Sequence, residues 1–314
     1  MSKEVLRLGT RKSPMAMAQS ARVAQLITER TGHPVELVGM SSFGDVTGAR
    51  LDQIGGQGVF VSALRSSLAA GDVDFAVHSL KDLPTADVPG IALAAVPVRD
   101  DPRDALIGAG GAKLADLPEG ARIGTGSPRR AAQLRLMRPG LLPVPVRGNA
   151  GTRLAKVTSG ELDAVVLAYA GLARVNQLDV VTQVFEVEEM LPAPGQGALA
   201  VECRSADEPM ISLLSCADDP STRAAVCAER MVLAQLEAGC SAPVGAYAAG
   251  TGVLQLTAVA MGEDGGPALR ARLSGPASQA EQLGRDVAAE LLRRGAGKTT
   301  AASAAASSDG DDAQ

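Results

Sequence analysis

The sequence predicts an α/β protein with two similar lobes that face a cleft, followed by a small α+β domain. Three observations lead to this prediction. Apolar runs of strand length alternate with helix-length segments, which is the order that produces parallel βαβ units. Motifs near the N-terminus return, in the same order, more than eighty residues later. From about residue 217 the pattern changes to a helix, three short strands and a closing helix.

The N-terminal segment gives the clearest βαβ pattern. Residues 5–10 form an apolar run that ends in Gly-Thr, which predicts a buried strand. Ser13 and Pro14 follow as an N-cap and a first-turn proline, so a helix is expected over 15–30. The pattern continues with a strand over 34–40, a helix over 61–70 and a strand over 74–78. Residues 41–60 are glycine-rich, and such a loop over an α/β sheet is a candidate lid.

An internal repeat supports two similar lobes. LGTRKSP at 8–14 returns as IGTGSP at 123–128, 115 residues further on. GDVDFAVHSLKDL at 71–83 aligns without gaps on GELDAVVLAYAGL at 160–172, an offset of 89 residues. Ligands of α/β proteins bind at the carboxyl ends of strands and at the helix N-termini that follow them, so chemistry is expected there.

The C-terminal third has a different texture. LPAPGQ at 191–196 predicts a hinge-like turn, and 198–204 predicts a further strand. A helix over 222–237, strands around 245–249, 253–261 and 268–273, and a helix over 278–294 then form the small α+β domain. The tail from 295 to 314 has little apolar bulk and is predicted to be disordered.

Composition excludes several classes of function. A net charge of −5 and a pI near 5.2 argue against general nucleic-acid binding. The sequence shows no signal peptide and no apolar run long enough to cross a membrane. The four cysteines (Cys203, Cys216, Cys227 and Cys240) have no CxxC spacing, which predicts neither a metal site nor a disulfide framework. A reducing, cytoplasmic location is therefore expected.

One stretch of this acidic chain is strongly basic. Residues 124–153 contain no Asp, Glu, Lys or aromatic residue but hold six arginines, Arg129, Arg130, Arg135, Arg138, Arg147 and Arg153. Arg129 and Arg130 follow Ser127 at the start of a predicted helix, where backbone N–H groups already favour an anion. Arg147 and Arg153 repeat the arrangement one βα unit later. The pattern favours a site for small anions, and the alternative is a solvated basic face.

Two further residues are candidates for chemistry. Asp82, next to Lys81, follows a predicted strand, where it could stabilise a developing cation or move protons. Its alternative role is an N-cap or turn aspartate before Pro84. Cys240 lies in a turn after a helix, and an accessible loop thiol can act as a nucleophile or an attachment point.

Together these residues resemble the porphobilinogen deaminase (hydroxymethylbilane synthase) family. The resemblance runs from Val5 to about Arg294 and is carried by seven strings in order: LRLGTRKSPMAMAQ, FAVHSLKDLPT, RDDPRDAL, IGTGSPRRAAQL, VRGNAGTRL, LPAPGQGALAVECR and LEAGCSAPVGAYA. It implies a transferase that polymerises four porphobilinogen molecules head to tail, with loss of ammonia, into the linear tetrapyrrole hydroxymethylbilane. This reaction belongs to tetrapyrrole, porphyrin and heme biosynthesis.

The resemblance also implies roles for individual residues. Cys240 would carry a covalent dipyrromethane cofactor through a thioether, and Asp82 would be the catalytic carboxylate that stabilises cationic azafulvene and protonated pyrrole species. Contacts to the cofactor carboxylates are implied for Lys81, Thr125, Ser127, Arg129 and Arg130. Contacts to the substrate are implied for Arg11, Ser13, Arg147, Arg153 and Arg174.

The family's architecture consists of two periplasmic-binding-protein-like lobes and a third domain that carries the cysteine loop. It implies lobe one over 1–97 with 194–216, lobe two over 98–193 and the third domain over 217–294. A monomer without metal, acting on a small molecule, is expected.

Some positions depart from the family's pattern. Gln57 replaces a usual lysine, Gly126 a usual serine and Pro128 a usual aliphatic residue, and Ala173 stands where a basic residue is common. None of these departures falls on Asp82 or Cys240. A rival hypothesis from another class is a non-catalytic, two-lobed protein that binds or senses anions.

Overall fold

The computed structural model describes residues 4–40, 58–237, 242–262 and 267–296. Contacts divide the chain into two compact units, one formed by residues 1–100 and 197–223 and the other by 101–196 and 224–314. Cys240 and Gln57, most of the candidate lid and residues 297–314 of the predicted tail lie outside the described residues.

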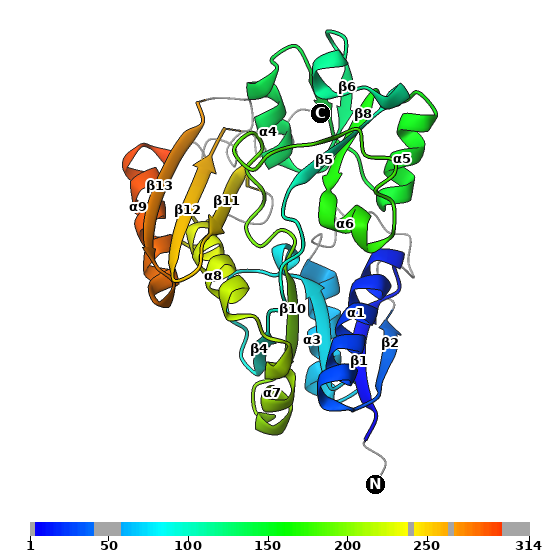
Figure 1. Cartoon of the computed structure of the whole chain (residues 1–314), viewed down its shortest axis with the longest axis vertical. Coiled ribbons are helices and arrows are strands. Elements are labelled where there is room, and N and C mark those ends of the chain that lie inside the picture. The colour runs from blue at the N-terminus through cyan, green and yellow to red at the C-terminus, as the bar shows by residue number, and fades with distance from the viewer. Residues whose placement is uncertain (1–3, 41–57, 238–241, 263–266, 297–314) are drawn as a thin grey trace, which may run out of the picture. The chain divides into compact units, whose positions relative to one another are not determined.

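The first unit is built on a five-stranded sheet of order β2-β1-β3-β10-β4 (Figure 1). β1 is parallel to β2 and β3, whereas β10 runs antiparallel between β3 and β4. Its strands are β1 (Leu6–Arg11), β2 (Val35–Met40), β3 (Phe75–Ser79), β4 (Ile91–Ala95) and β10 (Leu199–Arg204). Its helices are α1 (Pro14–Thr31), α3 (Gly58–Ala70) and α7 (Glu208–Leu214).

Local sequence explains why α1 begins and ends where it does. The Ser13 hydroxyl accepts a hydrogen bond from the Ala16 N–H at 3.3 Å, and Pro14 occupies the first turn. The helix ends at Gly32, whose φ of 72° lies in the left-handed region that glycine adopts without strain. Val23 and Ile27 turn into the core beneath the sheet. The predicted helix is confirmed to within one residue at each end.

The second unit contains a sheet with the same spatial arrangement of parallel and antiparallel strands, in the order β7-β6-β8-β5-β9, although its inner antiparallel strand comes first in the chain and not last. β6 is parallel to β7 and β8, and β5 runs antiparallel between β8 and β9. The strands are β5 (Asp104–Gly108), β6 (Arg122–Gly124), β7 (Leu142–Val144), β8 (Ala164–Ala168) and β9 (Gln183–Val184). The helices are α4 (Pro128–Met137), α5 (Ala150–Thr158) and α6 (Tyr169–Arg174).

A shared hydrogen-bond motif supports the internal repeat at the level of single residues. In the first unit the Arg7 N–H donates to the Asp74 carboxylate at 2.7 Å, and the Asp74 N–H donates back to the Arg7 carbonyl. In the second unit Arg122 and Asp163 exchange the same pair of bonds, again at 2.7 Å. Since the offsets between the pairs are the 115 and 89 residues of the sequence repeat, the predicted similarity of the two lobes is confirmed.

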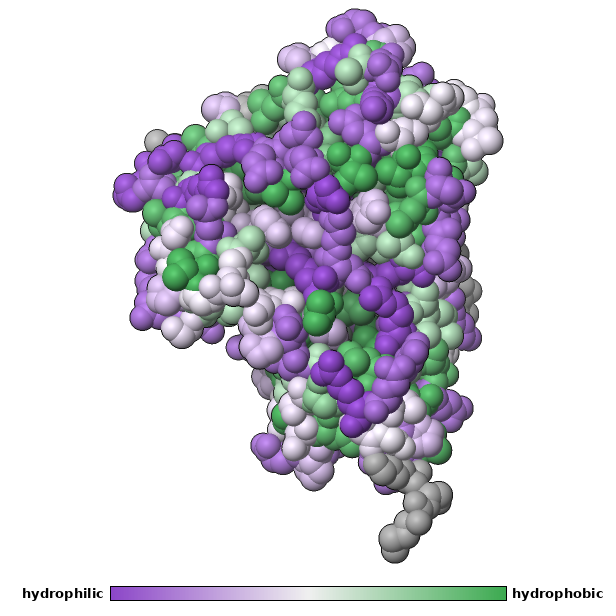
Figure 2. Space-filling view, viewed as in Figure 1, coloured by the Kyte–Doolittle hydropathy of each residue, from purple (hydrophilic) through white to green (hydrophobic). Residues whose placement is uncertain are grey.

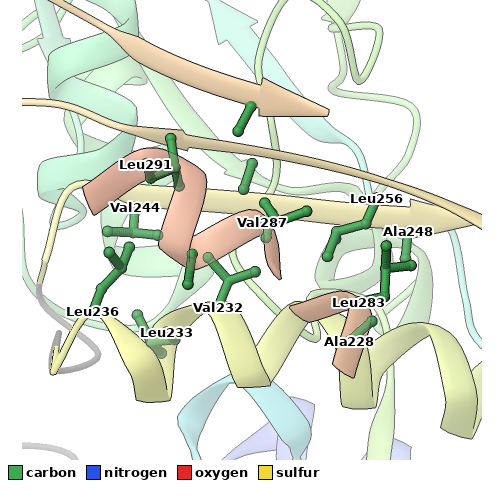
Figure 3. Packing of buried hydrophobic residues seen from close by; sticks show 14 of the residues in the cluster. Ala228, Val232, Leu233, Leu236, Val244, Ala248, Leu256, Leu283, Val287 and Leu291 are labelled. Carbon is green, nitrogen blue, oxygen red and sulfur yellow. The ribbon is translucent and has the colours of Figure 1, made fainter. Parts of the chain in front are cut away.

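A three-stranded antiparallel sheet and two helices form the remaining part of the second unit. The sheet joins β11 (Val244–Ala249), β12 (Val253–Ala260) and β13 (Leu269–Pro276), and the helices are α8 (Pro220–Gln235) and α9 (Ala280–Arg293). Its buried core contains only alanine, valine and leucine, as a chain with 2% aromatic residues requires (Figure 3). Gly284 lets α9 approach α8 closely, because a Cβ there would lie 2.5 Å from the Ala228 carbonyl oxygen.

The α/β class, the two matching lobes and the small α+β domain are thus confirmed. The sequence patterns missed β4, β5, β9, α6 and α7. Ala296, assigned to the predicted tail, is instead fully buried in the core between the three-stranded sheet and its two helices. The three predicted domain boundaries stay a prediction, since the division by contacts groups the second five-stranded sheet with the three-stranded one.

None of the helices within the described ranges is both long enough and apolar enough to span a membrane. Hydrophilic and apolar residues interleave over the face shown in Figure 2. Large exposed apolar side chains such as Val98, Val253 and Val5 lie far apart in the sequence, which is usual for a protein surface.

Candidate functional site

In the first unit the predicted site residues lie at one edge of the sheet. Arg11 ends β1 and Ser13 caps the helix that follows, while Lys81 and Asp82 follow β3 in a short 3-10 turn, η1 (Leu80–Asp82). β1 and β3 are parallel neighbours, so their carboxyl ends share an edge. The structure therefore brings these four residues to the same end of lobe one.

Asp82 belongs to the turn and does not cap it. The N-cap position of η1 is Ser79, and the turn closes through a bond from the Leu83 N–H to the Leu80 carbonyl. Lys81 and Asp82 are both half-buried. Asp82 is therefore a turn aspartate before Pro84, as one part of the alternative held, and its carboxylate also lies at the strand end where chemistry is expected.

In the second unit the start of α4 is built from hydroxyl groups. Ser127 caps the helix and accepts the Arg130 N–H at 3.4 Å, and Thr125 accepts the Ser127 N–H at 3.2 Å. Pro128 fits the first turn, which explains its place in this chain. Arg129 and Arg130 then point into the lobe and are only 2% and 6% exposed.

A buried aspartate that the sequence reasoning missed holds both arginines. Asp104, the first residue of β5, is 0% exposed. Its Oδ2 accepts from Arg129 Nη2 at 2.8 Å, and its Oδ1 accepts from Arg130 Nη2 at 2.7 Å and from Arg130 Nε at 3.0 Å. The anion beside the two cations at this helix start is therefore, in this structure, a carboxylate of the protein itself.

The charges of this cluster shift its ionisation. Burial alone would raise the pKa of Asp104, but the two guanidinium groups outweigh it and hold that pKa well below its usual range. Burial, and then the neighbouring Arg130, lower the pKa of Arg129 against the opposing effect of Asp104. Two cations and one anion leave an excess positive charge at the start of α4.

The predicted hinge-like turn at 191–196 makes hydrogen bonds that hold Asp104 in place beside Arg129 and Arg130. The Gln196 side-chain amide donates to Asp104 Oδ1 at 2.8 Å and to the Pro102 carbonyl at 2.7 Å. The adjacent Gly195 N–H donates to the fully buried Glu229 at 2.8 Å, and Glu229 also accepts the Ala248 N–H at 2.9 Å. A continuous set of hydrogen bonds therefore connects α8 and β11 with Asp104.

The remaining predicted arginines of lobe two follow its other parallel strands. Arg147 comes after β7 and is exposed, Arg153 lies in the first turns of α5 and Arg174 ends α6, after β8. Arg153 donates through Nε to the Gly148 carbonyl at 2.9 Å. Burial and, to a smaller extent, Arg130 lower the pKa of Arg153. Two like charges have thus been placed within electrostatic reach of each other.

The glycine at 126 has a physical cause. A Cβ at this position would lie 2.9 Å from the Val146 carbonyl oxygen and 3.8 Å from Arg153 Nη2. A side chain here would press on backbone beside the arginine. The departure at Gly126 therefore keeps the start of α4 open next to Arg153.

The basic stretch is not a single solvated face. Arg129 and Arg130 are buried, and Arg138 donates to the Leu114 carbonyl at 2.7 Å. The alternative of a solvated face is therefore wrong for these two buried arginines. The six arginines also do not all belong to one anion site, because Arg138 donates a hydrogen bond to a loop of the protein itself.

The donors that remain suit small carboxylates. Arg129 Nε is buried and has no hydrogen-bond partner among the described residues. It lies beside the excess charge of the cluster, and charge-assisted bonds from guanidinium to carboxylate are the strongest that such a site offers. The excess positive charge at the start of α4 could attract a carboxylate, so Thr125, Ser127, Arg129, Arg130 and Arg153 remain candidate ligand contacts.

The described cysteines have the properties of structural thiols. Burial raises the pKa of Cys203 to about 11 and also raises the pKa of Cys216. Cys227 is half-buried and packs against the core of the three-stranded sheet. Cys203 and Cys216 are therefore poor nucleophiles at neutral pH. Within the described ranges no group of three or more His, Cys, Asp and Glu residues is placed to hold a metal ion.

These features define a class of protein: repeated α/β lobes whose strand ends present a carboxylate in one lobe and arginines in the other, with a small α+β domain. Models of known families agree with it. The model described as "Porphobilinogen deaminase, dipyromethane cofactor binding domain" matches residues 6–212. The model of the C-terminal domain of the same enzyme matches residues 223–293. The chain belongs to the porphobilinogen deaminase family.

Named relatives cover almost the whole chain. Porphobilinogen deaminase of Thermobifida fusca is 59% identical, with 97% of this chain and 98% of that protein aligned. Porphobilinogen deaminase 1 of Streptomyces coelicolor is 52% identical, over 94% of this chain and 97% of the relative. The Mycobacterium leprae protein is 49% identical, over 93% and 95%.

Solved structures share the fold only remotely. The methionine-binding protein MetQ has a TM-score of 0.45 at 10% identity, over 68% of this chain and 89% of its own. A periplasmic substrate-binding protein from Coxiella burnetii has a TM-score of 0.43 at 16% identity, over 68% and 91%. Likenesses at this level say nothing about ligands.

Proposed function

We propose that this chain polymerises four porphobilinogen molecules head to tail, with loss of ammonia, into the linear tetrapyrrole hydroxymethylbilane. One observation carries the proposal: the cofactor-binding and C-terminal models of this family together match the chain from residue 6 to residue 293, with a gap of only ten residues. The identity of 59% to the Thermobifida enzyme supports it. The chain is then a transferase of tetrapyrrole, porphyrin and heme biosynthesis.

We infer that the cofactor is dipyrromethane, attached through a thioether to Cys240. When bound, it supplies a tethered pyrrole end onto which new units are joined, so that intermediates stay on the protein. Lys81, Thr125, Ser127, Arg129 and Arg130 would hold its carboxylates. The unpartnered Arg129 Nε and the excess charge around Asp104 support this assignment in lobe two.

The substrate-side contacts are assigned to Arg11, Ser13, Arg147, Arg153 and Arg174. Each lies at or shortly after the carboxyl end of a parallel strand of its own lobe, or belongs to the helix that comes next. Arg153 is the best supported of them. Its pKa is lowered by burial and by Arg130, so a carboxylate of the substrate would relieve an existing repulsion.

Asp82 is assigned the catalytic role. Its carboxylate lies in a tight turn at the carboxyl end of β3 and would favour the positive charge that develops on the pyrrole as ammonia leaves. Arginines dominate the corresponding edge of the other lobe, and such groups cannot do this. A carboxylate is therefore the group that a developing cation requires.

We propose the domain division of the family for this chain: residues 1–97 with 194–216, residues 98–193 and residues 217–294. The position of β10 within the first five-stranded sheet supports the assignment of 194–216 to lobe one. We also propose a cytoplasmic monomer whose partner is the small-molecule substrate, without a role for nucleic acid.

Intact-mass spectrometry of the purified protein tests the cofactor assignment. The protein should be heavier than its sequence by one dipyrrole, and the excess should disappear in Cys240→Ser. Cys216→Ser is the matched control, because it removes a half-buried thiol of raised pKa and should keep the excess mass. Fully active protein with the mass of the bare sequence would contradict the assignment.

Consumption of porphobilinogen separates the enzyme from the rival anion-binding protein. The enzyme should consume substrate continuously and release one ammonia for each unit joined. A binding protein would take up substrate in proportion to its own concentration and then stop. Saturable binding without release of ammonia by the cofactor-bearing protein would overturn the proposed activity.

A further inference from the structure

The three-stranded sheet has one face that is only partly covered. α8 and α9 pack on the other face and bury the alanine-rich core. On the open face, Leu191 and Ala132 cover Val259 and Met261 at one end of the sheet. Beyond this contact the cross-strand row Tyr247, Thr257 and Arg272 stays accessible, and it contributes to the lining of a pocket of about 520 Å³.

Three arginines and one acidic residue, Glu188, contribute to the lining of this pocket. Arg270 and Arg272 stand two residues apart on β13 and so point to the same face, about 7 Å from each other along the strand. Arg294, after α9, is the third. All three are exposed and lie far in sequence from the basic stretch at 124–153.

The hydrogen bonds of two of these arginines leave their charge uncompensated. Arg270 Nη1 donates to the Glu188 backbone carbonyl at 3.1 Å, and Arg272 donates to the side-chain amide oxygen of Gln255. Among the described residues, only Arg294 of the three has a carboxylate partner, Glu290 at 2.6 Å. Neutral oxygens therefore orient two guanidinium groups at the pocket without cancelling their charge.

We propose that this pocket is a second anion site, which binds a small organic molecule with two or more carboxylate or phosphate groups. The spacing of Arg270 and Arg272 suits two anionic groups about 7 Å apart, and a guanidinium fork can grip each group with two hydrogen bonds. The Tyr247 ring and the Thr257 side chain form part of the lining between strands. The volume lies within the range of small-molecule sites.

This site is independent of the proposed function. None of its lining residues is among the residues assigned to cofactor, substrate or catalysis. Another pocket, of about 640 Å³ next to β9, offers less, because its arginine, Arg138, already donates to the carbonyls of Leu114 and Ala115.

The sequence provides a built-in probe for the test. The chain has two tyrosines and no tryptophan, so in Tyr169→Phe the fluorescence of tyrosine comes from Tyr247 alone. The cofactor-bearing Tyr169→Phe protein would be titrated with citrate and, separately, with inorganic pyrophosphate at constant ionic strength. A saturable change in tyrosine fluorescence with either anion supports the site, and the anion that binds more tightly identifies the group it prefers.

Variants decide where the anion binds. In the same background, Arg272→Gln should raise the apparent Kd at least about tenfold, since a charge-assisted bond is lost. The double variant Arg270→Gln, Arg272→Gln should abolish the response. Arg285→Gln is the matched control, because it removes an equal charge from α9 at a residue paired with Glu281, and it should titrate like its parent.

Three outcomes would overturn the proposal. The first is no saturable response to either anion. The second is an equal response to sodium chloride at matched ionic strength, which means general screening. The third is an unchanged response in the double variant, which places the anion elsewhere, for example at the arginines of lobe two. Unchanged porphobilinogen turnover and far-ultraviolet circular dichroism in the double variant would show that it is folded.

Discussion

Each lobe has a buried acidic residue on the strand that holds the fourth position in its sheet, but the two acidic residues have different roles. In lobe one Glu202 of β10 accepts from Arg65 of α3 at 2.6 Å and 3.0 Å, and Nε2 of His78 lies 3.3 Å from it without the direction of a hydrogen bond. In lobe two Asp104 of β5 binds Arg129 and Arg130 from the start of α4. Both strands run antiparallel beside the last parallel strand of their sheet.

The position along the strand separates a core acid from a site acid. Glu202 lies opposite Ala76, near the beginning of β3, whereas Asp104 lies opposite Ala168, the last residue of β8. Carboxyl ends of parallel strands are where α/β proteins bind ligands. Asp104 therefore orients arginines at the site edge, and Glu202 stabilises the interior of lobe one. A shared scaffold has acquired two different electrostatic roles.

Removal of the lobe-one carboxylate should have the largest effect on activity. The repeat places Gly171 in lobe two where lobe one has Asp82, so lobe two offers no substitute. Asp82→Asn should lower porphobilinogen turnover per cofactor-bearing molecule about a hundredfold or more. Asp87→Asn, an exposed carboxylate on the same loop, is the control and should turn over normally. Near-normal turnover of Asp82→Asn would remove Asp82 from the catalytic role.

The largest loss of stability is expected for Asp104→Asn. It leaves two buried guanidinium groups facing an amide, and removal of one partner of a buried ion pair costs about 3–5 kcal/mol. Urea denaturation followed by circular dichroism measures the change. A loss similar to that of a surface variant would mean that water, rather than Asp104, compensates the arginines.

Glu202→Gln should destabilise the protein less, and in a pH-dependent way. Burial would raise the pKa of Glu202, but His78 and Arg65 lower it from 4.5 to about 2. A depressed carboxyl pKa stabilises the folded state above the unfolded pKa and loses this effect as pH falls towards the folded pKa. The contribution, on the order of 3 kcal/mol, should therefore be present at pH 7 and fade between pH 4.5 and 2.

Acid titration of stability checks this sign. The difference in unfolding free energy between the parent and Glu202→Gln should shrink steadily as pH falls below 4.5. The Glu202→Gln variant itself should still lose stability as the pH falls through this window, and part of that loss would come from protonation of Asp104 in lobe two. A difference that stays constant with pH would show that Glu202 acts through packing and not through its charge.

The smallest difference is expected at the repeated Arg–Asp motif. In lobe one the Arg7 side chain also binds Asp74, at 2.7 Å, but the Arg7 side chain is 43% exposed, so solvent screens the ion pair. Arg7→Gln should lower Tm slightly. Among the described residues of lobe two, only backbone groups of Arg122 bind Asp163, and its guanidinium makes no ion pair with that carboxylate, so Arg122→Gln should leave Tm unchanged. Equal effects of the two substitutions would mean that the side-chain ion pair adds nothing.

Sequence patterns predicted much of the fold because its signals are local. Ser13 with Pro14, and Ser127 with Pro128, predict where two helices begin, and both are confirmed. The strands that were missed are short, or, like β5 in RDDPRDALIG, begin with charged residues that hide the apolar run. No periodic pattern marks such a strand.

The partners of the arginines could not be predicted from local pattern. Asp104 is 25 residues from Arg129, and Gln196 is 66 residues from Arg130. Their contact depends on the antiparallel insertion of β5, which no periodicity predicts. The available signal was indirect: two arginines at a helix start, without a nearby acid, require an anion from elsewhere. The family resemblance supplied that anion as a ligand, and the structure adds one from the protein.

The order of strands in the first sheet has a consequence for biosynthesis. β10, which lies between β3 and β4, is the last strand of this sheet to be translated, and all five strands of the second sheet precede it in the chain. During synthesis, residues 1–100 therefore lack one strand of their sheet until residue 204 has left the ribosome. Lobe two can fold as a continuous segment during this interval. The nascent chain thus completes its arginine-bearing lobe before the lobe that carries Asp82.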